Sequence, residues 1–255
     1  MIMKAGVVSG GVRVREGGSG GGAVLLLLHG LGATSDVWDP LIRRWPGRWL
    51  APDLPGHGGS PPLAAYSFAG LAAAITGVVP AESPVVVLAH SLGGVVGLTL
   101  AGGPVPVRAV IGLGIKVAWT DADLDRAQAV ARRPVAWFAS RDDAAARYLR
   151  VSGLDGLLAA DDPVVDAGLI QQGERWRLAA DPAAFALGVP DVARLVAGSR
   201  APVTLARGEL DPMNTDEELA GLGAPVVTLP GLGHNAHVQD PELTATLLDL
   251  PRFYS

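Results

Sequence analysis

Short apolar runs recur along the chain and are separated by longer stretches in which apolar and polar residues mix. The first run, Val24–Leu28, shows no alternation of apolar and polar positions, which is typical of a strand that is covered on both faces of a sheet. Similar runs occupy residues 48–51, 84–88, 108–113, 202–206 and 225–229. We predict that these segments are the strands of one sheet.

Stretches long enough for a helix lie between most of these runs, at residues 36–45, 67–79 and 92–101. Strands that alternate with helices predict a mostly parallel sheet with helices on both faces. Near the N-terminus, two valine-rich segments flank Ser9-Gly10-Gly11, which predicts a small hairpin. The expected fold class is therefore α/β, in a single domain that covers residues 1–255.

One interval breaks this rhythm. From about residue 121 to residue 199 no buried-strand run appears, and the apolar spacing is helical, as in Leu124, Ala127 and Val130. We interpret this segment, called the insertion below, as a helical insertion between two strands of the sheet. It is not expected to form a separate domain.

Composition and charge narrow the class of protein. With 255 residues, 49% of them hydrophobic, the chain can bury one sizeable core. The net charge is −5 and no block of like charges occurs, which argues against nucleic acid or an anionic membrane surface as a partner. The chain has no cysteine, so disulfides, thiolate metal sites and a cysteine nucleophile are excluded.

The hydropathy pattern gives no membrane span. The longest wholly apolar run covers residues 23–28, whereas a transmembrane helix needs roughly 20 apolar residues. The N-terminal residues lack the apolar stretch of a signal peptide. We therefore expect a cytoplasmic protein, and the sequence does not indicate its oligomeric state.

The most informative motif surrounds Ser91. A buried run leads directly into Ala89-His90-Ser91-Leu92-Gly93-Gly94, and a helix-compatible segment follows. Small residues two positions before and after a serine permit a sharp strand-to-helix turn that exposes the hydroxyl group. The helix that begins there directs its free N–H groups and its positive dipole end at the site. We predict that Ser91 is a catalytic nucleophile.

A serine nucleophile needs a base within hydrogen-bond reach and an acid that orients this base. His234 lies in a glycine-flanked loop directly after the run 225–229, from which it can reach the nucleophile. His237, three residues later, is the rival base. His29, His57 and His90 are less suited, because each adjoins a strand end or a turn from which it is not expected to reach Ser91.

The acid is expected just after the run 202–206. Asp211 precedes Pro212, and a following proline keeps the backbone of the aspartate extended. Glu209 lies nearer the strand end and is the rival acid. The chain order serine, acid, histidine is that of one known arrangement of such triads, and the predicted triad is Ser91, Asp211 and His234.

Two backbone N–H groups are expected to stabilise the oxyanion of the reaction. One belongs to Leu92, the residue after the nucleophile. The other is assigned to Leu31, in the loop His29–Gly32 that follows the first buried run. Loss of one such donor typically costs about 3 kcal/mol of transition-state stabilisation.

Taken together, these motifs resemble the α/β-hydrolase superfamily over almost the whole chain. The resemblance rests on segments that occur in the family's order, namely His29–Gly32, Asp53–Ser60, Ala89–Gly94, Gly208–Asp211 and Gly233-His234. It implies an eight-stranded, mostly parallel sheet and a helical lid formed by the insertion. It also implies catalysis without a cofactor or a metal ion.

A narrower resemblance concerns the base loop. Gly233–His237 followed by Asp240-Pro241 is similar to the loop of the menaquinone-pathway synthases that eliminate pyruvate to form a cyclohexadiene carboxylate. The serine turn of those synthases continues Gly-Gly-Arg, whereas Val95 follows Gly94 here. The missing arginine matters because their substrate carries several carboxylates.

The substrate cavity is expected between the serine turn and the insertion. Its candidate lining residues are Gly30, His90, Lys116, Trp119, Trp137, Trp176 and His237. Lys116 ends an apolar run at the carboxyl end of a strand, where ligand sites of parallel sheets are built. We hypothesise that Lys116 binds an anionic group of the substrate.

The leading functional hypothesis is a hydrolase that cleaves a small-molecule ester through an acyl-enzyme on Ser91. The alternative is a cofactor-free lyase or synthase in which Ser91 and His234 move protons without an acyl-enzyme. A third hypothesis is a non-catalytic receptor for a small ligand, and perhydrolysis on the same triad also stays open. The expected partner is in each case a small molecule.

Overall fold

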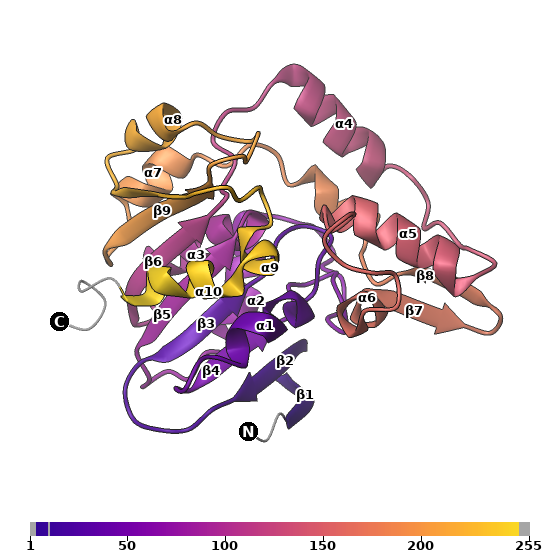
Figure 1. The fold of residues 1–255 in the computed structure, drawn as a ribbon, viewed down its shortest axis with the longest axis horizontal. Coiled ribbons are helices and arrows are strands. Elements are labelled where there is room, and N and C mark those ends of the chain that lie inside the picture. Colours follow the sequence, from indigo (N-terminus) through magenta and orange to yellow (C-terminus); the bar gives the residue numbers. More distant parts are fainter. Residues whose placement is uncertain (1–3, 10, 250–255) are drawn as a thin grey trace.

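The computed structural model describes residues 4–9 and 11–249, and in this part of the chain eight strands form one central sheet (Figure 1). Across the sheet the order is β1-β2-β4-β3-β5-β6-β9-β10. The strands are β1 (Lys4–Ser9), β2 (Val12–Gly17), β3 (Val24–Leu28), β4 (Trp49–Pro52), β5 (Val85–His90), β6 (Val107–Leu113), β9 (Val203–Gly208) and β10 (Val226–Leu229).

Strand direction follows the sequence pattern. β2 pairs antiparallel with β1 and with β4, and every other neighbouring pair in the sheet is parallel. β3 and β5, at the centre, are buried along their whole length, as expected from runs without alternation. The prediction of an eight-stranded, mostly parallel α/β sheet is confirmed, as is the antiparallel strand pairing of the N-terminal hairpin, although Gly10 of its turn lies outside the described residues.

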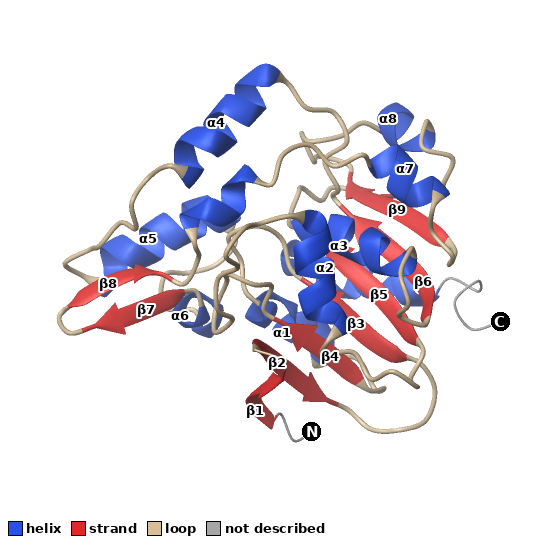
Figure 2. Cartoon of the chain, turned by 180° about the vertical axis from the view of Figure 1, so that it is seen from behind, coloured by secondary structure: helices blue, strands red, loops and turns tan. Residues whose placement is uncertain are grey.

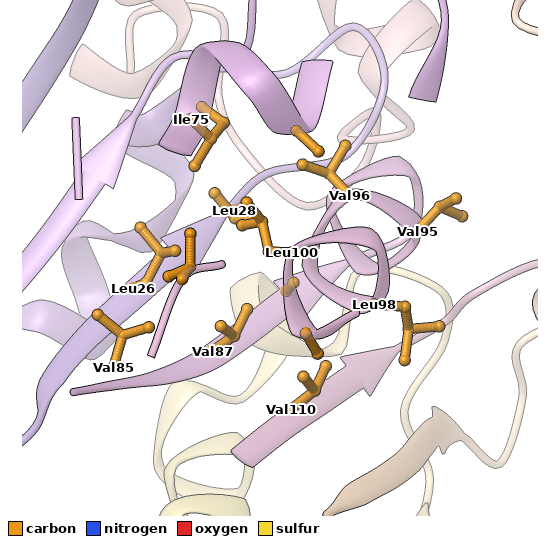
Figure 3. Close-up of a cluster of buried hydrophobic side chains, with 14 of the residues drawn as sticks. Leu26, Leu28, Ile75, Val85, Val87, Val95, Val96, Leu98, Leu100 and Val110 are labelled. Atoms are coloured by element: carbon orange, nitrogen blue, oxygen red, sulfur yellow. The ribbon is translucent and has the colours of Figure 1, made fainter. Parts of the chain in front are cut away.

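Helices cover both faces of the sheet, as Figures 1 and 2 show from opposite sides. On one face α2 (Phe68–Thr76) and α3 (Leu92–Ala101) pack against alternate side chains of the central strands (Figure 3). α7 (Val192–Ala197) and α8 (Asp216–Ala220) join the same apolar cluster. The opposite face is covered by η1 (Ser35–Trp38), α1 (Asp39–Ile42), α9 (Ala236–Gln239), α10 (Pro241–Ala245) and η3 (Thr246–Asp249).

The chain between β6 and β9 contains the insertion. Its elements are α4 (Asp121–Ala131), α5 (Arg141–Ser152), α6 (Pro163–Ala167), β7 (Leu169–Gln172), β8 (Arg175–Leu178) and η2 (Pro182–Ala186), followed by α7. In Figure 1 α4, α5, α6 and the two strands lie to one side of the central sheet. α7 instead packs against α3 and belongs to the helical layer of the sheet.

The interpretation of the insertion as helical is wrong for residues 169–178. β7 and β8 form a separate two-stranded antiparallel sheet. Both strands have four residues, and Leu169 is the one buried residue in them, so they lack the continuous apolar run that marks the central strands. The alternation Arg-Trp-Arg-Leu in β8 is the sequence signal of a half-buried strand.

The two long helices of the insertion are anchored differently. α5 buries Ala144, Ala145, Tyr148 and Leu149 in the apolar cluster on the face of the sheet that α1 and α9 cover. α4 buries no side chain and packs mainly against η2. In the described part of the chain, no helix combines the length and apolarity that crossing a bilayer requires.

Candidate active site

Ser91 lies at the turn between β5 and α3, with φ 50° and ψ −116°. Among the described residues it is the one non-glycine residue with positive φ, a conformation that persists only where the surroundings enforce it. Its N–H donates to the Leu113 carbonyl at 2.8 Å. The hydroxyl group does not cap α3, makes no hydrogen bond within the described chain, and lines a cavity. It is therefore free to react.

Close packing explains the small residues around Ser91. A Cβ atom at Gly93 would lie 2.5 Å from the Leu28 carbonyl oxygen, so the first turn of α3 can approach the end of β3 only with glycine there. A Cβ atom at Gly30 would lie 3.4 Å from Ser91 Cβ. The loop after β3 and the serine turn are thus in direct contact.

This contact brings together the two predicted oxyanion donors. Leu31 and Leu92 both line the cavity that contains Ser91. Neither backbone N–H group donates a hydrogen bond to another described residue. Two unused donors beside a free hydroxyl group are the arrangement that stabilises a tetrahedral oxyanion.

His234 and Asp211 form a hydrogen-bonded pair, with 3.0 Å between His234 Nδ1 and Asp211 Oδ2. The Asp211 carboxylate is fully buried, whereas the His234 side chain is 19% exposed and lines the same cavity as Ser91. Because the carboxylate accepts the proton on Nδ1, the lone pair on Nε2 is left for a proton from the nucleophile.

The rival residues lie elsewhere. The exposed Glu209 carboxylate accepts a hydrogen bond from the Gly231 N–H at 2.8 Å and does not contact His234. His237 is buried, with its ring centroid 4.5 Å from that of Trp38, and is absent from the cavity lining. The geometry therefore favours Asp211 and His234 over both rivals.

The turn that carries the acid, Gly208–Asp211, is held by Arg207, a buried residue of β9. Its guanidinium donates to the carbonyl oxygens of Glu209 and Asp211, at 2.9 and 3.1 Å. The Met213 N–H donates to Asp211 Oδ1 at 2.9 Å, which leaves Oδ2 directed at His234. Sequence reasoning missed Arg207. Its position at the end of a strand, next to the turn that carries the acid, could have suggested that it supports this turn.

His90 connects the serine turn to the base loop. Its Nε2–H donates to the His234 carbonyl at 2.9 Å. Burial lowers the pKa of His90 well below its usual value, so the ring stays neutral and keeps this single donor at neutral pH. His90 lines the cavity, as predicted, but its hydrogen bond indicates that it positions the loop of His234.

His29 fastens the loop that carries Leu31. The Leu54 N–H donates to His29 Nε2 at 2.8 Å, so the ring proton must sit on Nδ1, which donates to the Gly30 carbonyl at 2.8 Å. Burial lowers the pKa of His29, consistent with a neutral ring. The side chain thereby ties the loop after β3 to the turn after β4.

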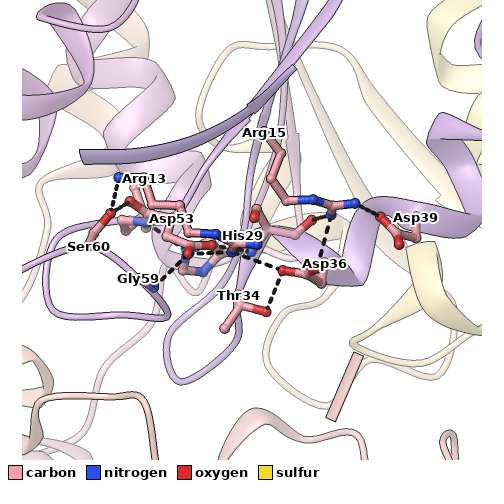
Figure 4. Close-up of polar contacts among 11 residues, drawn as sticks. Arg13, Arg15, His29, Thr34, Asp36, Asp39, Asp53, Gly59 and Ser60 are labelled. Carbon is pink, nitrogen blue, oxygen red and sulfur yellow. Dashed lines mark hydrogen bonds and ion pairs between the residues drawn. The ribbon is translucent and has the colours of Figure 1, made fainter. Parts of the chain in front are cut away.

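Asp53 strengthens the same junction (Figure 4). Its buried carboxylate accepts hydrogen bonds from the Ser35 and Gly59 N–H groups, at 2.8 and 2.9 Å, and pairs with Arg13 at 2.7 Å. Burial alone would raise the pKa of Asp53, but these cationic and N–H partners hold it below the usual value. The Asp53–Ser60 motif is therefore a structural clamp.

Asn235, next to His234, connects the base loop to the insertion. Its side-chain amide donates to the Gly153 carbonyl, at the end of α5, at 2.9 Å. Val151 of the same helix lies against Gly32 in the loop after β3, because a Cβ atom on Gly32 would be 2.9 Å from Val151 Cγ1. The end of α5 thus contacts both loops of the site.

The cavity beside Ser91 has a volume of about 450 Å³. Its walls come from the loop after β3, the serine turn, α4, the end of α5, η2 and the base loop. Most of its lining side chains are apolar, which suits a small organic ligand. Of the residues predicted to line it, Gly30, His90, Lys116 and Trp119 do so.

The other three residues that were predicted to line the cavity do not line it. Trp137 is covered by the guanidinium groups of Arg175 and Arg177, 5.4 and 5.8 Å from its ring centroid. Trp176 lies on β8, where its backbone pairs with Phe138. These two tryptophans pack the insertion together, and His237 packs against Trp38, so predicting them as cavity walls was wrong.

Lys116 reaches the cavity but its charge is already engaged. Its Nζ atom lies 3.0 Å from Asp123 Oδ2, on α4, and 5.3 Å from the Trp119 ring centroid. The ion pair ties the loop after β6 to α4. This arrangement does not favour the hypothesis that Lys116 binds an anionic group of the substrate.

Comparison with known proteins supports the fold. A model of the alpha/beta hydrolase family matches residues 25–247. The structure also superposes on that of an E-2-(acetamidomethylene)succinate hydrolase with a TM-score of 0.81 and 26% sequence identity, over 97% of each chain.

Sequence relatives carry esterase and lipase names. The chain is 40% identical over 77 residues to a pimeloyl-[acyl-carrier protein] methyl ester esterase of Neisseria meningitidis serogroup B, a match that spans 29% of each protein. It is 33% identical over 162 residues to lipase LipV of Mycobacterium tuberculosis, which covers 62% of this chain and 60% of the lipase. The chain thus spans less than two thirds of the length of these relatives.

Proposed function

The chain belongs to the alpha/beta hydrolase family, and we propose that it is a serine hydrolase that cleaves a small-molecule ester. The observation that carries the proposal is the free hydroxyl group of Ser91 in the same cavity as His234, whose Nδ1 is held by the buried Asp211 carboxylate at 3.0 Å. The esterase and lipase names of the relatives support the same chemistry.

In the proposed reaction Ser91 Oγ attacks the ester carbonyl while His234 Nε2 takes the hydroxyl proton. The Leu31 and Leu92 N–H groups bind the oxyanion. The intermediate then expels the alcohol, which receives the proton from His234, and leaves an acyl group on Ser91. A water molecule, deprotonated by His234, attacks this acyl group. The second intermediate then expels Ser91 Oγ, which takes the proton back from His234, and the acid is released.

The insertion is proposed to act as the lid of this site. α4, the end of α5 and η2 supply a large part of the cavity wall. Closure of such a segment removes water from the ester and strengthens the electrostatic contacts around it.

The test is pre-steady-state hydrolysis of a p-nitrophenyl ester with a short acyl chain. We expect a burst of about one p-nitrophenol per protein, because the acyl-enzyme forms before it is hydrolysed. Ser91→Ala should abolish the burst and lower kcat by at least about 10⁴-fold. The lyase and receptor alternatives predict no burst, so its absence in the wild type would contradict the proposal.

Ser152→Ala is the matched control. Ser152 also lines the cavity, but its hydroxyl group donates to the Tyr148 carbonyl at 2.8 Å, which is an ordinary contact within a helix. This variant should retain the burst. Mass spectrometry of the acylated protein should then place the adduct on Ser91.

A further inference from the structure

We propose that the substrate is an anionic ester whose negative group pairs with the guanidinium of Arg150. This inference rests on the proposed function, since it names the substrate class of the same cavity. Arg150 lies in the last turn of α5 and lines the cavity that contains Ser91. Its side chain has no hydrogen bond or ion pair with any residue in the described part of the chain.

The other charges of the lining are compensated. Lys116 and Asp123 pair with each other at 3.0 Å, and Asp123 also accepts from Arg126 and from Thr120. Asp123 is the one carboxylate residue among the described lining residues. Because the charges of Lys116 and Asp123 compensate each other, Arg150 gives the lining of this largely apolar cavity a net positive charge. Such a charge favours an anionic ligand.

The backbone around Arg150 is held in place from both sides. Tyr148 and Leu149 are buried in the apolar cluster on the sheet face that α1 and α9 cover. Asn235 donates to the carbonyl of Gly153, directly after α5. Val151 packs against Gly32 in the loop that carries Leu31. The guanidinium group is thus carried by a fixed turn that touches both loops of the site, so an anion bound there would share the cavity with the reacting ester.

Guanidinium groups bind carboxylates and phosphates through charge-assisted hydrogen bonds. The anion could belong to the acyl group or to the alcohol of the ester. Two pairs of esters separate these sources. The first compares p-nitrophenyl adipate monoester with p-nitrophenyl hexanoate, and the second compares 3-carboxy-4-nitrophenyl butyrate with 4-nitrophenyl butyrate.

The experiment measures KM and kcat for both pairs in the wild type and in Arg150→Gln. In at least one pair, we expect the substitution to raise the KM of the anionic ester by about tenfold and to change that of its neutral counterpart by less than about twofold. Arg150→Lys should restore part of the difference. Raised salt should weaken the preference of the wild type for the anionic ester.

Arg147→Gln is the matched control. Arg147 lies one turn earlier on α5 and also lacks a partner among the described residues, but it lines a separate cavity of about 80 Å³. The Arg147→Gln variant should leave the KM values of all four esters unchanged. An equal change for anionic and neutral esters in Arg150→Gln, or a lowered melting temperature with unchanged discrimination, would assign Arg150 a purely structural role and overturn the inference.

A second measurement does not depend on hydrolysis. Calorimetry at neutral pH measures the affinity for adipate. Relative to the wild type, this affinity should be about tenfold weaker in Arg150→Gln and unchanged in Arg147→Gln. If no ester is hydrolysed, the proposed function fails, and adipate binding then decides only whether Arg150 binds an anion in this cavity. Equal adipate binding by the wild type and Arg150→Gln would overturn it.

Discussion

At the scale of single residues, Asp211 and Glu209 offer two carboxylates on one turn, and geometry separates their roles. We predict that Asp211→Asn lowers kcat by about 10³- to 10⁴-fold, because the amide no longer holds the His234 ring in the productive tautomer. Glu209→Gln should stay within about twofold of the wild type, since an amide oxygen can still accept from the Gly231 N–H.

Steady-state hydrolysis of a p-nitrophenyl ester measures both variants, with urea denaturation as a check on folding. A loss of activity in Glu209→Gln as large as that in Asp211→Asn would contradict the assignment. That outcome would indicate that Glu209 contributes to catalysis as the acid.

Gly114 lies directly against the hydrogen-bonded pair of Asp211 and His234. A Cβ atom on Gly114 would lie 3.2 Å from His234 Nδ1 and 3.3 Å from Asp211 Oδ2, and its φ is +64°. We expect Gly114→Ala to displace the pair and lower kcat by at least about tenfold, because small misplacements of reacting groups are costly. It should also destabilise the fold by about 1–2 kcal/mol through the left-handed conformation.

Gly223→Ala isolates the backbone effect in this experiment. Gly223 has φ +75°, but a Cβ atom there would meet nothing within 4 Å. The two variants should lose similar stability in urea denaturation, and Gly223→Ala should keep full activity. Equal activity of the two variants would show that Gly114 does not position the pair.

At the scale of elements, α4 is a helix of the insertion that has no side chain in the core. It buries no side chain, and the ion pair between Lys116 and Asp123 ties it to the loop after β6. We predict that Lys116→Met increases amide hydrogen exchange across residues 124–131, because α4 then opens more often. Exchange in α5, which is anchored in the apolar cluster, should not change.

Arg126→Met is the control for this prediction. Arg126 pairs with the same carboxylate, but it lies on α4 itself and its side chain is 75% exposed. A pair within one helix does not fasten that helix to the rest of the protein, so exchange should stay at the level of the wild type. Similar exchange in the two variants would refute the role of Lys116 as a tether.

The elements that were predicted well share a physical cause. β3 and β5 are buried on both faces of the sheet, so their burial requirement is visible as an unbroken apolar run. The hairpin of β7 and β8 was missed because its strands are short and half exposed. Elements held mainly by contacts with their neighbours leave a weak pattern in the sequence.

At the scale of the whole molecule, the residues of the candidate site could be predicted from strand ends, but their connections could not. The His90 side chain bonds to a backbone group 144 residues away, and Asn235 bonds to one 82 residues away. Such contacts depend on how the strands order themselves across the sheet. The expectations for Trp137, Trp176 and His237 were wrong for the same reason, because proximity in space was inferred from residue type.

The buried histidines make the whole fold sensitive to acid. In the described chain, burial lowers the pKa of His29, His57, His90 and His237, to about 3 for His57 and His237. An unfolded histidine has a pKa of about 6.5. Below that pH the unfolded chain binds protons that the folded chain excludes, so the stabilisation is complete above about pH 6.5 and is lost as the pH falls.

His237 provides the test of this coupling. Its Nδ1 atom has no hydrogen-bond partner among the described residues, and the ring packs between Trp38 and His90. His237→Met removes the titrating group while roughly conserving its volume. Between pH 6 and pH 5 the free energy of unfolding should fall less steeply than in the wild type, by about 1.4 kcal/mol per pH unit. Urea denaturation at pH 7.5, 6.0 and 5.0 measures this difference, and equal slopes would show that His237 exchanges protons with solvent in the folded state.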